Sequence, residues 1–289
     1  MIDLSSLAGK TVRIAGETGL IGSHMSKTAS DASARVRTDW INADIVLHCA
    51  GFGQPAKFMK DPITTIEVNT KLTIDLLKSV KPGGTFLFCS SSEVYSGLRN
   101  WAADETDIGT TTPQHPRGAY IEGKRAGEAI VHAFRNAGVN ALSARIALAY
   151  GPGTKKHDTR VLNQFIEKAL TLGKIELLDS GIATRTYGYI DDIAETLWNV
   201  VLHGREEVYN VGGYSATSIV DLAKQIGSLT GAEVVVPETS NSMVGAPLEV
   251  RMDLSRVEKE FGKSEYVSLE EGLKRTIEYQ RGLYGIQTA

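Results

Sequence analysis

Short apolar runs alternate with amphipathic stretches through the first half of the chain. The apolar runs lie at Thr11–Ala15, Asp44–Cys49, Thr85–Cys89 and Ala141–Ile146. The stretches between them have the spacing of helices, at Ser23–Ser30, Thr64–Val80 and Ala119–Ala137. Strands that alternate with helices in this way predict a parallel sheet covered by helices on both faces.

The pattern becomes less regular after the turn at Tyr150–Gly153. Helices are predicted at Val161–Leu172 and Asp191–Leu202, a strand at Ile175–Leu178, and helices broken near Gly262 within Leu254–Tyr284. We therefore expect an α/β main domain over residues 1–150. Residues 151–289 should form mainly a smaller lobe, with segments that return to the main domain.

Three glycines follow the first apolar run directly. Gly16, Gly19 and Gly22 form the pattern G-x-x-G-x-x-G at a predicted strand-to-helix turn. Without side chains, the backbone there can approach a pyrophosphate group at the N-terminus of a helix. The turn, with Leu20 and Ile21, is thus a candidate dinucleotide-binding site. The alternative is a glycine turn needed only to pack the strand against the helix.

The region after the glycine turn is unusually short. A dinucleotide-binding unit usually carries an acidic residue about 20 residues beyond its glycines, where it holds the adenine ribose. Only Ser23–Ala43 separates the last glycine from the next apolar run, which is too short for two further strands with their helices. Asp39 is either this ribose-binding acid, at the end of a residual strand Arg35–Thr38, or a helix cap before Trp40.

Polar side chains follow the apolar run Thr85–Cys89, in the segment Ser90–Tyr95. In open α/β sheets, ligands bind at the carboxyl ends of the strands. Further on, Tyr120 and Lys124 lie four residues apart on a predicted helix, so both project from one face. A nearby ammonium should lower the pKa of the phenol, which makes Tyr120 a candidate general base for a hydroxyl that Ser91 also holds. The alternative is an amphipathic helix with a packed tyrosine and a solvated lysine.

Together these motifs resemble the extended short-chain dehydrogenase/reductases, the NAD-dependent epimerase/dehydratase family, over nearly the whole chain. Further segments similar to family motifs occur in family order: HCAG at His48–Gly51, Asn69 in EVNT, TRTYGYIDD at Thr184–Asp192 and YNVGG at Tyr209–Gly213. The resemblance implies a Rossmann-like doubly wound parallel sheet with a smaller C-terminal substrate-binding lobe. It implies NAD as cofactor, held by the glycine turn, Asp39, Ala50, Gly51, Asn69, Tyr120 and Lys124.

Within the family, the segments SSEVY, YIEGKR, DTRVLNQFIEKAL and TRTYGYIDD look most like UDP-glucuronate decarboxylases. By that resemblance, NAD oxidises C4 of a nucleotide sugar, the β-keto acid loses carbon dioxide, and the bound NADH reduces the ketone again. The resemblance assigns catalysis to Ser91, Glu93, Tyr120 and Lys124.

The acidic position at the strand end separates the reactions of the family. Glu93 stands where decarboxylases and 4,6-dehydratases carry a glutamate, whereas Ser92 replaces the aspartate that is usual in dehydratases. Decarboxylation is thus favoured, with nucleotide-sugar 4-epimerisation as the alternative. The alternative role of Glu93 is that of a solvated loop carboxylate.

Candidate substrate-binding residues follow from the same resemblance. Ser91 and Ser92 at the strand end are assigned to the substrate. Arg185 is similar to the family arginine that grips the nucleotide diphosphate, and the fixed fork of a guanidinium suits phosphate oxygens. Arg160, in the DTRV segment, and Arg251 are further candidates. The alternative for Arg185 is an arginine on a solvated face.

One departure from the family lies in the segment RIALAYGP. Leu148 stands where the family commonly has an asparagine that helps to hold the sugar nucleotide, and a leucine cannot make that contact. Together with the shortened cofactor region, this change predicts a divergent subgroup. Its donor is bound differently, or is not one of the usual UDP-sugars.

Composition and charge argue against several other classes of function. A formal net charge of −3 without a lysine- or arginine-rich stripe argues against nucleic acid as a partner. No apolar run approaches the length that spans a bilayer and the N-terminus lacks the plan of a signal peptide, so a cytoplasmic protein without a membrane partner is expected. Cys49 and Cys89 lie in apolar runs and are interpreted as buried free thiols. The six histidines lack metal-ligand spacing, and no metal is predicted.

Two other functions remain open at this point. A net reductase would consume NADPH together with its substrate, and a non-catalytic dinucleotide sensor would keep the fold for binding partners. The intact set of Ser91, Tyr120 and Lys124 argues against a sensor. The family resemblance further implies a homodimer, in which Thr64–Val80 and Ala119–Ala137 pair with their copies as a four-helix bundle.

Overall fold

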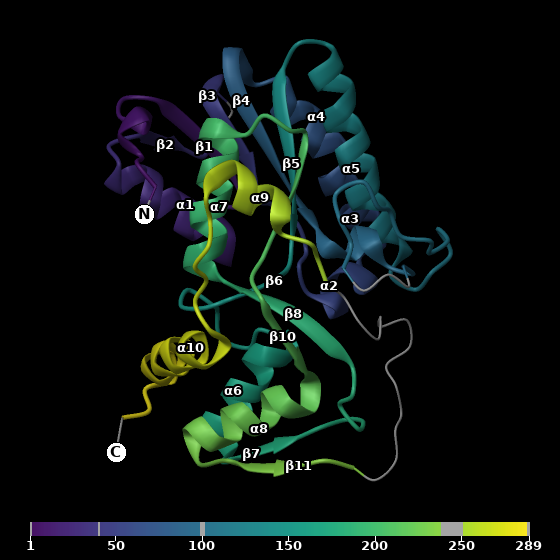
Figure 1. Ribbon diagram of the computed structural model, residues 1–289, viewed down its shortest axis with the longest axis vertical. Helices are drawn as coiled ribbons and strands as arrows, with labels where there is room; N and C mark the ends of the chain where they lie inside the picture. Colours follow the sequence, from purple (N-terminus) through teal and green to yellow (C-terminus); the bar gives the residue numbers. More distant parts are fainter. Residues whose placement is uncertain (1, 40, 99–101, 238–250, 288–289) are drawn as a thin grey trace.

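The computed structural model describes residues 2–39, 41–98, 102–237 and 251–287. Its main layer is a six-stranded parallel sheet with the order β2-β1-β3-β4-β5-β9 (Figure 1). The strands are β1 Thr11–Ala15, β2 Arg35–Arg37, β3 Ala43–His48, β4 Val80–Ser91, β5 Asn140–Ile146 and β9 Val208–Val211. The predicted parallel sheet is confirmed.

Helices cover both faces of this sheet (Figure 1). One face carries α3 (Pro62–Asn69), α4 (Lys71–Leu77) and α5 (Gly118–Asn136), and the other carries α1 (Leu20–Asp31), α7 (Ile190–His203) and α9 (Ser255–Phe261). Alternation along β4 divides the two cores, because successive side chains of a strand point to opposite faces. Phe86 and Phe88 pack with α4 and α5, whereas Leu87 and Cys89 belong to the core that includes α1 and α7.

The second half of the chain builds a smaller unit below the sheet (Figure 1). β6 (Leu148–Tyr150), β8 (Thr184–Tyr189) and β10 (Ser215–Ser218) form a sheet with the order β10-β8-β6, and β7 (Lys174–Glu176) pairs with β11 (Glu233–Val235). These strands pack with α6 (Val161–Leu172), α8 (Ile219–Thr230) and α10 (Leu269–Tyr284) around a second core. β9, α7 and α9 come from this half of the sequence but lie on the large sheet, so the chain passes between the two units several times.

Most predicted elements are present, but one helix was predicted too long. The stretch Thr64–Val80 contains two helices, because the backbone at Thr70 departs from helical geometry with φ −116° and ψ −72°. It also ends early, since Val80 already begins β4. The strands of the smaller unit were largely missed because each has only three to six residues. Both cysteines are free thiols, as predicted, with their Sγ atoms 3.5 Å apart. Cys89 in β4 is buried as expected, whereas Cys49, directly after β3, is only partly buried.

The close crossing of α5 over β4 can be tested at Gly127. A Cβ atom at this position would lie 2.4 Å from the ring of Phe88 and 2.9 Å from the carbonyl oxygen of Asn69. We expect Gly127→Ala to lower the free energy of unfolding by about 1–3 kcal/mol, the usual cost of overpacking. Gly282→Ala in α10 is the matched control, because nothing lies within 4 Å of its Cβ and the change should be neutral or mildly stabilising. Urea denaturation measures both, and equal stabilities would contradict the tight crossing.

Candidate functional site

The glycine turn joins β1 to α1 at the carboxyl edge of the sheet. Gly16 has φ +90°, and a Cβ there would lie 2.6 Å from the backbone nitrogen of Ala50. A Cβ on Gly22 would lie 2.1 Å from the carbonyl oxygen of Gly16, so packing alone requires glycine at both positions. Gly19 precedes the first helical residue, Leu20, and a Cβ there would meet only one backbone atom, at 3.3 Å. The turn therefore leaves the N-terminal N–H groups of α1 open to an anion, and it fits the pyrophosphate of a dinucleotide.

The other predicted cofactor residues lie on both sides of this turn. Ala50 and Gly51 follow β3, and a Cβ on Gly51 would lie 3.9 Å from Nζ of Lys124, so they connect the glycine turn to the lysine. Asn69 is fully buried between α3 and α5, where its amide nitrogen donates to Thr65 O at 2.8 Å. Its side-chain oxygen has no hydrogen-bond partner among the described residues.

Asp39 lies just beyond β2, the three-residue edge strand of the sheet. The predicted residual strand is therefore present, and the alternative of a helix cap is wrong, because the next described element is β3. The Asp39 carboxylate accepts two hydrogen bonds from Arg37, at 2.9 and 2.6 Å. Hydrogen bonds and charge from Arg37 lower the pKa of Asp39. An ionised carboxylate thus stands at this edge of the sheet.

Tyr120 and Ser91 meet at the carboxyl end of β4. Tyr120 is 9% exposed, and its ring stacks on Phe58 of α2 (Pro55–Lys60) with 4.5 Å between ring centroids. Burial raises the pKa of Tyr120 to about 12, against the lowering effect of a hydrogen bond with Ser91. The expected lowering by Lys124 is therefore wrong for this state of the protein, because desolvation outweighs the other effects.

Lys124 is buried beneath the same helix face. Its ammonium donates a hydrogen bond to the carbonyl oxygen of Cys89 at 2.7 Å and lies 5.8 Å from the centroid of the Tyr120 ring. Burial lowers the pKa of Lys124 to about 8. The alternative of a solvated lysine is wrong, since the residue is only 5% exposed.

Glu93 forms an ion pair beside the Ser91–Tyr120 contact. Its carboxylate lies 2.6 Å from Nη2 of Arg117, and both side chains are largely buried. Ser96 donates a further hydrogen bond to the carboxylate at 3.3 Å. Glu93 is therefore not the solvated loop carboxylate considered above.

The predicted substrate-binding arginines differ in their surroundings. The Arg185 guanidinium donates to Thr184 O at 2.8 Å, its pKa is lowered by burial, and the charges of Glu93 and Arg117 act on it. Arg160 forms an ion pair with Asp158 at 2.5 Å, and its charge acts on Tyr120.

The remaining positions singled out in the sequence are Ser92, Arg251 and Leu148, which lie in three different segments. Ser92 is buried at the start of the short helix η2 (Ser92–Tyr95). Arg251 precedes Met252, which forms an isolated parallel β-bridge with Ala103. The carbonyl oxygen of Arg251 accepts a hydrogen bond from Ala103 N at 3.1 Å. Leu148 is 36% exposed at the start of β6, beside Tyr187 of β8.

Sequence reasoning missed two residues that touch this cluster, Phe58 and Arg117. Arg117 lies 5.3 Å from the centroid of the Phe58 ring, so it packs on the ring that also stacks on Tyr120. The spacing offered one signal, because Arg117 lies three residues before Tyr120 and so faces the same side at the start of α5. Nothing in the sequence pattern singled out Phe58.

A family model described as the NAD dependent epimerase/dehydratase family matches residues 28–212. The chain belongs to this family. The match confirms the predicted fold class and NAD as the cofactor. It begins after the glycine turn, in keeping with the shortened region that follows.

Curated relatives include UDP-glucuronic acid decarboxylase 1 of Xenopus tropicalis, 32% identical over 244 residues, with 84% of this chain and 58% of the relative covered. The Danio rerio protein of the same name is 31% identical over 245 residues, with 83% and 58% covered. The chain thus spans less than two thirds of the length of these relatives.

Among solved structures, the epimerase Mth375 of Methanothermobacter thermautotrophicus has a TM-score of 0.85 at 20% identity, with 98% of this chain and 95% of that chain covered. A UDP-glucose 4-epimerase of Thermotoga maritima, solved with UDP-glucose, has a TM-score of 0.81 at 23% identity, with 95% and 99% covered. These likenesses show the same fold.

Two features are absent from the described part of the chain. No helix there is both long and apolar enough to cross a bilayer. The same residues contain no group of three or more histidine, cysteine, aspartate or glutamate side chains placed to hold a metal ion.

The buried Lys124 ammonium predicts a specific pH dependence of stability. Its pKa is about 8 in the folded chain and about 10.4 when unfolded, so between these values the unfolded chain binds more protons. The stability of the protein relative to Lys124→Met should therefore rise from pH 8 to pH 10.5, by up to roughly 3 kcal/mol, and stay level below pH 7. Urea denaturation of both proteins without cofactor, from pH 6 to pH 10, measures this difference. A difference that is constant across the range would contradict the buried charge.

Proposed function

We propose that this chain is an NAD-dependent nucleotide-sugar enzyme that decarboxylates a nucleoside diphosphate uronate, with UDP-glucuronate as the first substrate to test. The Glu93–Arg117 ion pair beside Ser91 and Tyr120 carries this proposal. A uronate brings a carboxylate that a guanidinium can bind through paired hydrogen bonds, whereas a neutral sugar needs no fixed cation at its reacting carbon. The relatives named UDP-glucuronic acid decarboxylases support the same substrate class.

Arg117 keeps hydrogen-bonding capacity for such a carboxylate. Nη2 is bound to Glu93, but the buried Nε atom has no hydrogen-bond partner among the described residues. Packing on Phe58 holds the guanidinium in place. Arg185 adds a second cation, which forms no ion pair with a residue in the described ranges and is suited to a phosphate or a carboxylate.

The proton-transfer steps of the proposed reaction fall to Tyr120. Ser91 and Tyr120 would hold the C4 hydroxyl, and Tyr120 would take its proton as C4 is oxidised. Because burial raises the pKa of Tyr120 to about 12, the phenolate needs a nearby cation at this moment, and Lys124 lies one helical turn away on the same face. Bound NAD would supply the hydride acceptor at C4 and return the same hydride at the end.

Decarboxylation itself breaks the bond between C5 and the carboxyl carbon. The electron pair of that bond moves into the enolate at C4 as carbon dioxide leaves, and C5 then takes up a proton to give the ketone. In this proposal the proton comes from solvent: Glu93 takes it up once Arg117 has turned to the substrate carboxylate, and then passes it to C5. Reduction of the ketone takes back the proton held on Tyr120. The net change is the uptake of one proton and the loss of one carbon dioxide, with no net redox change.

The proposal is tested by incubating the purified protein with NAD and UDP-glucuronate and following the anomeric region by proton NMR together with product mass. A UDP-pentose formed with release of carbon dioxide is the expected result. A new sugar of unchanged mass would instead establish epimerisation. Stoichiometric consumption of NADPH would establish a net reductase. The absence of any conversion would overturn the proposal for this substrate. It would favour a different donor, in keeping with Leu148 in place of the usual asparagine.

Tyr120→Phe should remove most of this turnover while leaving the fold intact. Loss of the phenolic proton carrier is expected to lower kcat by about 10²–10⁴-fold. Tyr150→Phe is the matched control, because the Tyr150 hydroxyl is also buried but has no hydrogen-bond partner among the described residues. Its kcat should stay within about threefold of the wild type. Near-normal turnover by Tyr120→Phe would remove this tyrosine from the mechanism.

We further propose a homodimer through α3 and α5, which pack against each other on one face of the sheet. The support is an apolar surface on and next to α3, where Ile63 is 73%, Ile66 44% and Met59 43% exposed. Exposed apolar side chains grouped in this way are typical of protein interfaces. A second copy of the chain is the occupant to which this proposal commits.

The dimer is tested by the double variant Ile63→Glu and Ile66→Glu. Placing two carboxylates in the contact should convert the dimer to a monomer in sedimentation velocity at micromolar concentration, because buried unpaired charges are costly. Leu172→Glu in α6 is the control, since Leu172 is 71% exposed on the smaller unit and should leave the dimer unchanged. A wild-type monomer, or a dimer that survives the double variant, would rule out this contact.

A further inference from the structure

Three side chains on successive turns of α5 contact three consecutive residues of β4. Tyr120 lies by Ser91, whose side-chain hydrogen bonding acts to lower the pKa of Tyr120, and Lys124 donates to Cys89 O at 2.7 Å. One turn further on, a carboxylate oxygen of Glu128 accepts a hydrogen bond from the Ser90 hydroxyl at 2.5 Å. Residues four apart lie on one face of a helix, so the three contacts fix how α5 is aligned along the strand.

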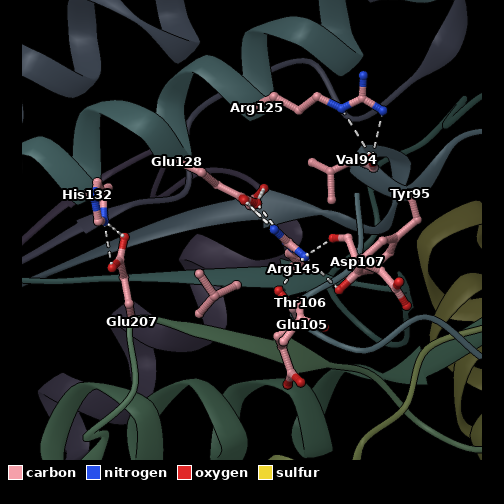
Figure 2. Close-up of polar contacts among 12 residues, drawn as sticks. Val94, Tyr95, Glu105, Thr106, Asp107, Arg125, Glu128, His132, Arg145 and Glu207 are labelled. Atoms are coloured by element: carbon pink, nitrogen blue, oxygen red, sulfur yellow. Dashed lines mark hydrogen bonds and ion pairs between the residues drawn. The ribbon is translucent and has the colours of Figure 1, made fainter. Parts of the chain in front are cut away.

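Arg145 of β5 balances the charge of Glu128. Figure 2 shows its guanidinium between Glu128 and Tyr95. Nη2 of Arg145 lies 2.8 Å from one Glu128 oxygen, and Nη1 donates to the Tyr95 hydroxyl at 2.9 Å. The Tyr95 hydroxyl in turn donates to Asn210 of β9 at 2.7 Å. The network thus joins α5 to the segment that carries Glu93.

The contacts along this face differ in how easily they can change. The Arg145 and Glu128 side chains are only 7% and 11% exposed, so this ion pair is almost excluded from water. Removing either partner of such a pair leaves a buried charge uncompensated, so the Glu128 carboxylate is held firmly. Among the described residues, Lys124 makes one hydrogen bond, to a carbonyl oxygen, and packs over the ring of Phe88. A ribose hydroxyl could replace that carbonyl oxygen as its hydrogen-bond partner.

We propose that Glu128 and Ser90 are positioning residues that keep Tyr120 on Ser91 while Lys124 changes partner. The Glu128–Ser90 hydrogen bond involves neither Tyr120 nor Lys124, so it persists when the lysine turns to a cofactor. The proposed positioning role rests on the contacts described above, and its effect on turnover rests on the proposed function. Arg145 acts through Glu128 by holding the carboxylate in place.

Ser90→Ala tests this role, with Ser143→Ala as the matched control. Ser143 lies on the adjacent strand β5, beside Phe88 and on the same face as Arg145, and its buried hydroxyl has no hydrogen-bond partner among the described residues. We expect Ser90→Ala to lower kcat by about tenfold or more and to change KM by less than about threefold. The reason is that a small displacement of a reacting group strongly lowers the rate of the chemical step. Ser143→Ala should stay within about twofold of the wild type on both constants.

A readout that needs no substrate separates this proposal from the proposed function. With tyrosine labelled at Cζ with ¹³C, the Tyr120 signal is identified by its loss in Tyr120→Phe. Ser90→Ala should displace this signal and Ser143→Ala should leave it in place. An unmoved signal, or a Ser90→Ala variant with wild-type kcat, would overturn the positioning role. A displaced signal in a protein that converts no nucleotide sugar would support the positioning role and count against the proposed function.

Discussion

The direct packing of α5 on β4 is the constraint on which the site depends. Gly127 allows this approach, since a Cβ there would lie 2.4 Å from the ring of Phe88. The close approach excludes water from the helix face that carries Tyr120 and Lys124. Burial then raises the pKa of Tyr120 to about 12 and lowers the pKa of Lys124 to about 8. Both shifts favour the neutral side chain, so the two ionised forms are best tolerated as a tyrosinate–ammonium pair.

The segment after β3 links this face to the glycine turn at the edge of the sheet. Gly16 lies against Ala50, and Gly51 follows directly and approaches the ammonium of Lys124. The Ala50–Gly51 backbone thus connects the glycine turn to the buried lysine. The sheet beyond β1 is reduced to the three residues of β2, yet this path does not use β2. The short sheet edge therefore leaves the connection between the glycine turn and Lys124 intact.

The centre of the large sheet could be predicted from sequence because β1, β3, β4 and β5 lie in apolar runs, which buried parallel strands require. The glycine turn and the Tyr120–Lys124 spacing were visible for a similar reason, since each depends on residues close together in the chain. The outer strand β9 was not predicted. The smaller unit was harder to predict, because its strands are short and its pairings join distant segments such as β6 and β8. Arg117 and Phe58 were missed because their contact is made by folding, between α2 and the start of α5. The pKa of Tyr120 was predicted in the wrong direction because burial cannot be read from helix spacing.

The balance of charges in the cluster favours the anionic ligand proposed above. Glu93 is paired with Arg117, and Arg160 is paired with Asp158, so these four groups are close to neutral together. Arg185 remains as a cation whose pKa is lowered chiefly by burial. Arg185 is partly buried, and a guanidinium in such a place loses hydration that neighbouring carbonyl groups replace only in part, so it should bind an incoming anion more strongly than an exposed arginine would. Because Arg185 comes from β8 in the smaller unit and Tyr120 from the large sheet, an anionic substrate bound by both would lie across the two units.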